Sequence, residues 1–210
     1  MKIDINALAP ADQYKLLSAT IVPRPIALVT TWSQSHGDNA APFSFFNVMG
    51  ENPPVLVLGL EQRRDGGGPK HTTANIAANG QFVVHMVDEA LAGAMNVCAI
   101  DFPEGQSEAL HAGLELTSSS TVRPSRIVAA PVAFECERIA LLQLSPGRHI
   151  AIGKVLVMHV RDGLLDPATL HIDTEAYRPV GRLHGRFYIR TRDRFEMQVP
   201  GYAQWLATRR

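Results

Sequence analysis

The stretch VAFECERIALLQL (residues 132–144) carries the strongest strand pattern in the chain. It is rich in β-branched and aromatic residues, which favour strands. Successive side chains of a strand point to opposite faces. Phe134 and Cys136 therefore lie on one face, and Glu135 and Glu137 lie on the other. The alternation predicts a half-exposed β-strand in which Cys136 is a small core residue.

Five further stretches carry similar strand patterns and are bounded by Gly, Pro or Asn: IALVTTW (26–32), VLVLGLE (55–61), QFVVHM (81–86), HIAIGKVLVMHV (149–160) and FYIR (187–190). Helical patterns are fewer and shorter: ADQYKLL (11–17), TTANIAAN (72–79) and DEALAGAMNVCA (88–99). The second begins at Thr72 and has Gly80 as its stop. The sequence therefore predicts a mainly β protein with a few short helices, in a barrel or a sandwich.

Size and charge exclude several classes of protein. The 210 residues, 46% of them hydrophobic, suffice for one sizeable core, so we expect a single domain over residues 1–210. Lys and Arg number 20, as do Asp and Glu, so no broad basic field is present to hold nucleic acid or an anionic membrane. No stretch reaches the roughly 18 apolar residues that span a bilayer, and residues 1–17 lack the apolar run of a secretion signal.

The cysteines and histidines show no reactive motif. Cys98 and Cys136 are too few for a disulfide framework, so we expect structural thiols and a reducing cytoplasm. None of the eight histidines lies in H-E-x-x-H, and no C-x-x-C or G-x-S-x-G occurs. We therefore expect neither a metal site nor a serine hydrolase, and the residues assign no catalytic acid, base or nucleophile.

KHTTANI (70–76) follows the glycine-rich stretch RRDGGGP (63–69), which we predict to be a loop, and begins a predicted helix. A helix start with Lys70 and Thr72 combines unpaired N–H groups, a hydroxyl and an ammonium, which suits a phosphate. The alternative is a threonine N-cap beside a solvated lysine. No P-loop and no G-x-G-x-x-G motif occurs, so a typical nucleotide-binding fold is not expected.

NAAPFSFFN (39–47) places Asn39 and Ser44 among three phenylalanines. Short polar groups beside apolar surface suit a flat ring with a polar edge. The phenylalanines can equally be core residues at the end of a strand. Both interpretations are open from the residues alone. Upstream, Arg24 stands between two prolines that restrict the chain.

Together these motifs resemble the flavin reductase-like FMN-binding proteins of the split β-barrel type. The stretches that carry the resemblance occur in family order: VPRPIALVTT (22–31), G-x-N-x-A-P-F-S-F-F-N (37–47), NPP (52–54), KHTTANI (70–76), FVVHMVDEALAGAMN (82–96), PVAFECE (131–137), IGKVLVMHVRDGLLD (152–166) and RPVGRLHGRFYIRTRDRFEM (178–197). The resemblance implies a six-stranded Greek-key split β-barrel that forms a homodimer, with FMN near the subunit interface and its phosphate at the loop-to-helix turn.

The resemblance also implies site residues. Those expected to contact FMN are Arg24, Pro25, Ile26, Thr31, Asn39, Ala41, Ser44, Phe45, Phe46, Lys70, Thr72 and Asn75. Those expected on the nicotinamide side are His149, Arg182, His184, Gly185 and Tyr188. Phe43 is expected to face the barrel interior. The chain departs from the common family pattern at His71, His85, Lys154 and His184.

The implied function is an NAD(P)H-dependent flavin reductase that passes hydride from the nicotinamide to FMN. Such a protein acts on small-molecule flavin and nicotinamide and can serve a partner oxygenase or another electron-acceptor protein. Two alternatives are open. One is an FMN-binding electron-transfer or carrier protein without NAD(P)H turnover of its own, and the other is a barrel that has lost its flavin and serves only in assembly.

Overall fold

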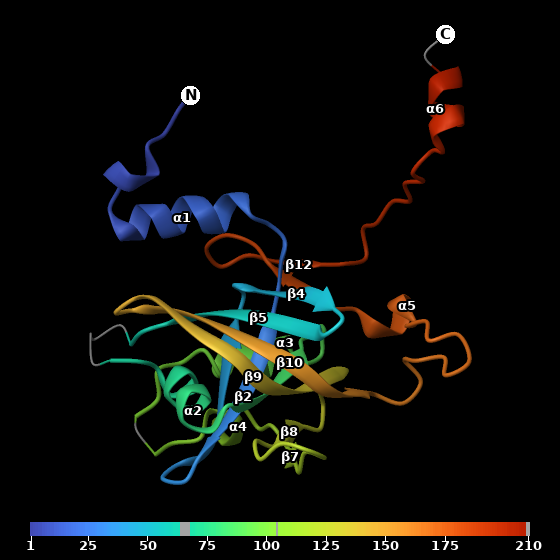
Figure 1. Cartoon of the computed structure of the whole chain (residues 1–210). Coiled ribbons are helices and arrows are strands. Elements are labelled where there is room, and N and C mark those ends of the chain that lie inside the picture. Colours follow the sequence, from blue (N-terminus) through green and yellow to red (C-terminus); the bar gives the residue numbers. More distant parts are fainter. Residues whose placement is uncertain (64–67, 104, 209–210) are drawn as a thin grey trace.

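The computed structural model describes residues 1–63, 68–103 and 105–208 (Figure 1). Most of the predicted glycine-rich loop, residues 64–67, lies outside this part. The main sheet is antiparallel, with seven strands in the order β3-β2-β6-β9-β10-β5-β4. These strands are β2 (Ala27–Ser33), β3 (Gly37–Phe43), β4 (Phe46–Glu51), β5 (Pro54–Glu61), β6 (Gln81–Met86), β9 (Val132–Ser145) and β10 (Arg148–Val160).

Smaller elements surround this sheet. The short strands are β1 (Arg24–Pro25), β7 (Leu116–Thr117), β8 (Arg126–Ile127), β11 (Val180–Arg182) and β12 (Tyr188–Arg190). The helices are η1 (Ile5–Ala7), α1 (Pro10–Thr20), α2 (His71–Asn79), α3 (Ala92–Val97), α4 (Glu108–His111), α5 (Thr174–Tyr177) and α6 (Tyr202–Ala207). Even the longest described helix, α1 with 11 residues, falls short of the apolar length that a membrane span requires.

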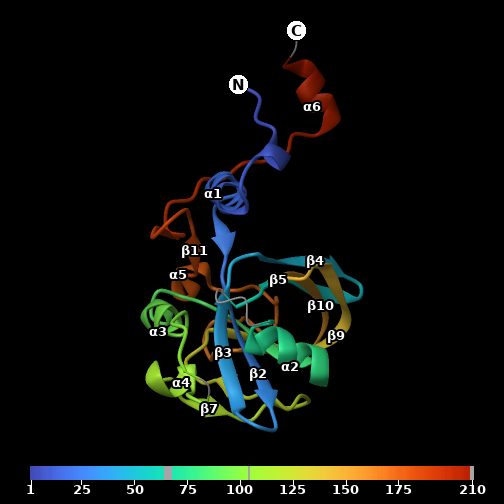
Figure 2. The same ribbon diagram turned by 90° about the vertical axis from the view of Figure 1, so that its left-hand side faces the viewer.

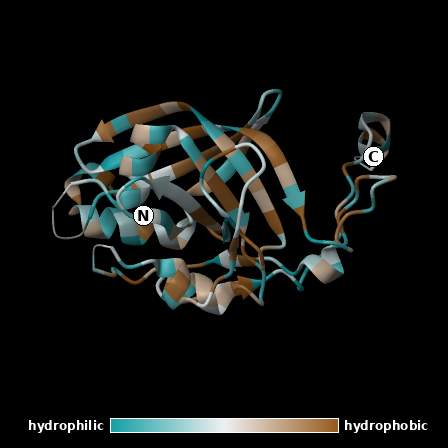
Figure 3. Cartoon of the chain, turned by 90° about the horizontal axis from the view of Figure 1, so that it is seen from below, coloured by the Kyte–Doolittle hydropathy of each residue, from teal (hydrophilic) through white to brown (hydrophobic). Residues whose placement is uncertain are grey.

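The predicted fold class, mainly β with a few short helices, is confirmed, and only the strand count differs in detail. Two segments that were not predicted as strands, β3 and β4, belong to the main sheet. The predicted strand at 187–190 forms β12 in a small sheet with β1 and β11 instead. Hydrophobic positions recur along the barrel strands (Figure 3), and the core between them includes Phe82, Leu58 and the predicted core residue Cys136.

Glu135 on β9 corrects the predicted strand pattern, because its side chain is fully buried rather than half-exposed. The loop after β7 folds over this face and supplies backbone N–H donors from Ser120 and Thr121, each 2.6 Å from the carboxylate. His159 Nε2 donates from β10 at 2.6 Å. Burial raises the pKa of Glu135, but these hydrogen bonds outweigh it and lower the pKa to about 2.

Helix α2 begins one residue before the predicted start and ends where predicted. Lys70 is its N-cap, and no side chain caps the first turn. Gly80 ends the helix in the left-handed conformation, with φ of 70°, which glycine adopts without steric cost. The predicted helix at 88–99 is shorter than expected, since α3 covers only residues 92–97.

Gly153 on β10 lies against the fully buried ring of Phe82, and a Cβ at position 153 would be 2.3 Å from Phe82 Cζ. We expect Gly153→Ala to lower the free energy of unfolding by about 1–3 kcal/mol, because the ring has no room to move. Urea denaturation measures this change. Gly93→Ala on α3 is the matched control, since a Cβ there meets nothing within 4 Å. Equal losses in the two variants would contradict the steric argument.

Candidate functional site

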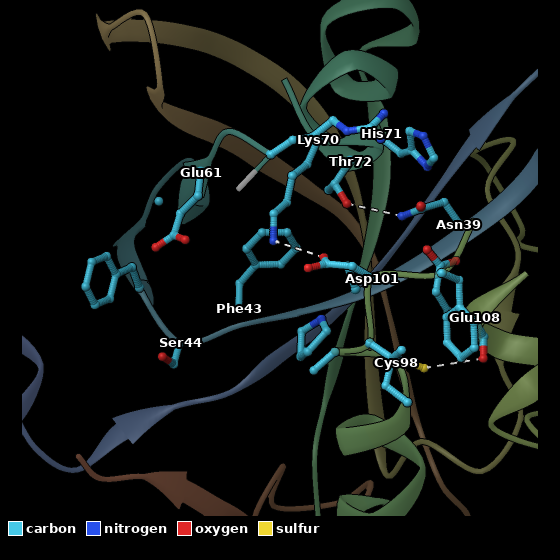
Figure 4. A pocket seen from close by; sticks show the side chains of 18 of the residues that line it. Asn39, Phe43, Ser44, Glu61, Lys70, His71, Thr72, Cys98, Asp101 and Glu108 are labelled. Carbon is cyan, nitrogen blue, oxygen red and sulfur yellow. Dashed lines mark hydrogen bonds and ion pairs between the residues drawn. The ribbon is translucent and has the colours of Figure 1, made fainter. Parts of the chain in front are cut away.

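A pocket of about 440 Å³, called the main pocket below, lies between the start of α2, the β3–β4 turn and the segment after α3 (Figure 4). It is lined by Tyr14, Asn39, Ala41, Pro42, Phe43, Ser44, Phe45, Gly59, Glu61, Arg63, Lys70, His71, Thr72, Cys98, Ala99, Ile100, Asp101, Phe102 and Glu108. The sequence-predicted FMN contacts among these residues are Asn39, Ala41, Ser44, Phe45, Lys70 and Thr72.

The uncapped start of α2 forms one end of the main pocket. The N–H groups of a first helical turn have no intrahelical partner, and the helix dipole is positive there. Lys70 adds an ammonium, whose Nζ lies 4.0 Å from Asp101 Oδ1. Thr72, in the same turn, also lines this pocket. This end of the pocket therefore presents donors suited to an anion.

Asn39 connects the start of α2 to the opposite wall of the pocket. In the amide orientation that pairs donors with acceptors, its side chain donates to Glu108 Oε1 at 3.1 Å. Its oxygen then accepts from Thr72 Oγ1, also at 3.1 Å. Both partners hold the Asn39 amide in a fixed orientation at the pocket wall, so its position does not depend on a bound ligand.

The phenylalanines of NAAPFSFFN divide between core and pocket. Phe43 and Phe46 pack against the barrel core, and Phe43 also lines the main pocket. Phe45 is more exposed, with its ring 5.9 Å from that of Tyr14 and 5.8 Å from the Arg24 guanidinium carbon. Residues of this stretch therefore lie both in the core and in the wall of the main pocket.

Arg24 is buried beside the pocket rather than in its lining. Its guanidinium donates to the carbonyl oxygens of Ser18, Ile21 and Leu183. Its Nε lies 3.3 Å from Ser44 Oγ, and burial lowers the pKa of the guanidinium. Arg24 therefore joins α1 and the segment after β11 to the β3–β4 turn.

The other predicted FMN residues lie outside the main pocket. Ile26 is a core residue, and Pro25 pairs with Gly181 across β1 and β11. Asn75 donates to Thr31 Oγ1 at 3.0 Å beneath α2. Asn75 also lines a second pocket of about 220 Å³, which shares Asn39, His71 and Glu108 with the main pocket.

The predicted nicotinamide-side residues fall in two places. Arg182, Gly185 and Tyr188 come together in the β11–β12 hairpin, where the Arg182 guanidinium carbon lies 4.5 Å from the Tyr188 ring centre. The neighbouring His184 ring is 5.3 Å from that of Phe187. His149 lies on β10 opposite Leu60. None of these five residues is among the described residues that line the main pocket.

The acidic residues of the main pocket are the part that sequence reasoning missed. Asp101 faces Lys70, Glu108 faces Asn39, and Glu61 pairs with Arg148 at 2.7 Å. Tyr14 from α1 and Phe102 also lie in the wall. These acidic and aromatic residues come from separate segments of the chain, so no local sequence motif predicted that they would line one pocket.

The departures from the family pattern have different surroundings. His85 is fully buried, with Nδ1 2.8 Å from the Leu28 oxygen and Nε2 accepting from Ile127 N at 2.9 Å. Burial lowers the pKa of His85 to about 4, so it stays neutral in the fold. His71 lines both pockets, with its ring 6.1 Å from that of His36. Lys154 is exposed on β10 opposite Glu137.

Cys98 lines the pocket, but its environment keeps it a thiol. Its Sγ donates to the backbone carbonyl oxygen of Glu108 at 3.8 Å, and burial raises the pKa of the thiol to about 12. The described residues contain no group of three or more His, Cys, Asp or Glu side chains that could hold a metal ion. The described residues that line the pocket offer hydrogen-bond donors and a few charged groups.

Comparison with known proteins defines the class: this is a flavin-related oxidoreductase with a split-barrel fold. A family model described as "Flavin reductase like domain" matches residues 19–181. The chain therefore belongs to the flavin reductase like family. A flavin reductase with a split barrel domain from Shewanella frigidimarina is 18% identical and covers 93% of this chain and 96% of its own, with a TM-score of 0.79. That likeness confirms the split-barrel fold.

Two solved structures are more similar in sequence. The 2-nitrobenzoate 2-nitroreductase of Pseudomonas fluorescens is 38% identical, with a TM-score of 0.88, over 96% of this chain and 98% of its own. Nitrilotriacetate monooxygenase component B from Bacillus cereus is 31% identical, with a TM-score of 0.88, over 94% of this chain and 98% of its own.

Proposed function

We propose that this protein is an FMN-binding, NAD(P)H-dependent flavin reductase. The observation that carries the proposal is the uncapped start of α2, with Lys70 beside it, opening into the main pocket of a flavin reductase like fold. The pocket volume of about 440 Å³ lies in the range of small-molecule and cofactor sites.

The donor set fits a phosphorylated flavin. The first-turn N–H groups of α2, Lys70 and the Thr72 hydroxyl would hold the phosphate. Asn39 and Ser44 would bind the polar edge of the ring, and Phe45 with Tyr14 would shield it from water. When bound, the flavin supplies the two-electron acceptor for hydride from NAD(P)H, so no protein nucleophile is needed.

The acidic residues limit how strongly the pocket attracts anions. The Lys70–Asp101 pair, at 4.0 Å and with side chains 31% and 65% exposed, is a loose surface pair of small net energy. A phosphate at the helix start can therefore displace Asp101 as the partner of Lys70. Glu61 already pairs with Arg148 and opposes binding less.

The proposed assembly is a homodimer that delivers electrons to a second protein or molecule. The similarity to component B of a nitrilotriacetate monooxygenase supports a partner oxygenase as the acceptor. We place the nicotinamide contacts on Arg182, His184, Gly185 and Tyr188 of the β11–β12 hairpin and on His149. Four of these residues lie together in the hairpin, outside the main pocket, so nicotinamide would approach the flavin from the hairpin side, whereas His149 lies apart from them on β10.

Anaerobic titration of the purified protein with NADH and with NADPH tests the function. We expect a yellow protein whose visible flavin band bleaches with at least one donor and returns on admission of air. Free FMN at the same concentration, without protein, is the control for uncatalysed reduction. A yellow protein that neither donor bleaches is a flavin carrier, and a colourless protein that takes up no FMN has no flavin function.

A second candidate activity is the reduction of a nitroaromatic acid. The similarity to a 2-nitrobenzoate 2-nitroreductase, at 38% identity, favours it. The same titration decides the question, because 2-nitrobenzoate added to the bleached protein without oxygen would restore the flavin band. If the band stays bleached, nitroaromatic reduction is excluded and flavin reduction stands.

A further inference from the structure

The C-terminal arm, residues 191–208, leaves the barrel and ends in α6 at a distance from the body (Figures 1 and 2). Its base is fixed by charge pairs. Arg190 and Arg192 both donate to Glu89 at 2.9 Å, and Arg194 pairs with Glu175. These contacts set the direction in which the rest of the arm extends, which is away from its own barrel.

The arm carries a continuous apolar face despite its exposure. Phe195, Met197 and Val199 alternate along an extended segment and are 84%, 79% and 96% exposed. In α6, Tyr202, Trp205 and Leu206 follow with the i, i+3, i+4 spacing of one helix face. Each spacing fits its own conformation, so both the extended segment and α6 present apolar side chains on one side. Such a pattern is typical of a segment that packs against another surface.

The barrel offers an apolar surface that its own helices leave open. The helices in substantial contact with the main sheet, α2, α3 and α4, lie against β2, β3 and β6. On the far side of the sheet, Leu142 of β9 pairs with Ile150 of β10, and Ile152 pairs with Val57 of β5. Directly paired residues share a face, so these four form one outer patch, in which Leu142 is 47% exposed and the other three are half-buried. Leu144, 64% exposed, continues it.

The arm is long enough to cross this outer patch on a neighbouring molecule. Residues 195–201, if extended, span about 20 Å, and α6 adds about 9 Å. Three neighbouring strands are only about 10–15 Å wide. Exchange of two arms would bury six aromatic side chains at about 150 Å² each, on the order of 900 Å². That area is roughly the surface, about 800 Å², that one partner buries in a stable interface.

We propose that the C-terminal arm packs across the outer patch of a second copy of this chain, so that the dimer is joined by two exchanged arms. The inference rests on the proposed homodimer and adds to it the segment that holds the two copies together. The patch and the arm are present in equal numbers, and a two-fold exchange removes both from water in each copy.

Site-specific photo-crosslinking tests the exchange. Phe195 is replaced by a photoreactive benzophenone amino acid, and unlabelled and ¹⁵N-labelled proteins are refolded together before irradiation. We expect covalent dimers that join position 195 to peptides from 54–61 or 132–160, with mixed isotope pairs present. Links only within one chain, or only to other surfaces, would overturn the proposal. The same amino acid at exposed Leu110 on α4 is the control and should give no such dimer.

Sedimentation of arm variants separates this inference from the function. Phe195→Ser with Val199→Ser should raise the dimer dissociation constant at least 10-fold. Leu110→Ser with Leu170→Ser, at positions 76% and 73% exposed, should not change it. An unchanged dissociation constant in the arm variant refutes arm exchange and leaves the dimer intact. A monomeric wild-type protein refutes both the arm exchange and the proposed homodimer. The NAD(P)H titration reports on the flavin function independently.

Discussion

Replacing Lys70 and Thr72 together with alanine is expected to raise the FMN dissociation constant about 100-fold. Hydrogen bonds to a charged group contribute about 1.5–3 kcal/mol each. We expect the lower end of that range because Lys70 is partly exposed and paired with Asp101 in the flavin-free protein. Titration of FMN followed by flavin fluorescence measures the change.

The matched control for this pair is Lys15→Ala with Thr20→Ala. Both residues are exposed on α1, and neither lines the main pocket. The control should keep wild-type affinity. Thr72 is buried and bonded to Asn39, so the test variant loses about 1 kcal/mol of stability, which denaturation of the flavin-free protein checks. Unchanged FMN affinity in a folded test variant would show that the phosphate does not bind at the start of α2.

Glu135→Ala is expected to cost about 3–5 kcal/mol of unfolding free energy, because it leaves buried donors without an acceptor. The backbone N–H groups of Ser120 and Thr121 and the ring of His159 all lose their partner. Glu137→Ala, two residues along on β9 and exposed, should change stability by no more than about 0.5 kcal/mol. Chemical denaturation at neutral pH compares the two variants.

The acid dependence of stability gives a second measurement on Glu135. Its pKa is about 2 in the fold against an ordinary 4.5. The stabilisation is therefore complete above pH 4.5 and is lost as the pH falls towards 2. In the alanine variant the slope of stability between these values should flatten. A loss of stability equal to that of Glu137→Ala, or an unchanged slope, would show that the carboxylate does not hold the loop.

The strands of the barrel were predictable where their composition is uniform, and not where turn residues interrupt them. β3 contains Gly37, Asn39 and Pro42, which normally mark turns. These residues are tolerated because β3 is an edge strand of the sheet. Pro42 has no backbone N–H, and on the open side of an edge strand no neighbouring strand requires one. The exposure of Glu135 was predicted wrongly for a different reason. Alternation assigns its face of the strand, but only the tertiary structure shows the loop that covers that face.

The candidate site was predictable where its residues lie in local motifs. The pocket end formed by Lys70, Thr72 and the start of α2 was predictable as one local cluster because these residues are adjacent in sequence. Asp101 and Glu108 could not, since they reach the pocket through the folding of the segment after α3. Arg24 was noted between two prolines and assigned to FMN by the resemblance, and Thr31 was assigned by the resemblance alone. In the structure Arg24 bonds to Ser44 and Thr31 bonds to Asn75.

Burial of the two cysteines has a practical consequence for labelling experiments. Burial raises the pKa of both Cys98 and Cys136 to about 12, so neither forms appreciable thiolate at neutral pH. Because the thiolate is the form that alkylates, maleimide and iodoacetamide should leave the native thiols unmodified. A single cysteine introduced elsewhere would then accept a fluorophore or spin label without prior mutation of either native residue.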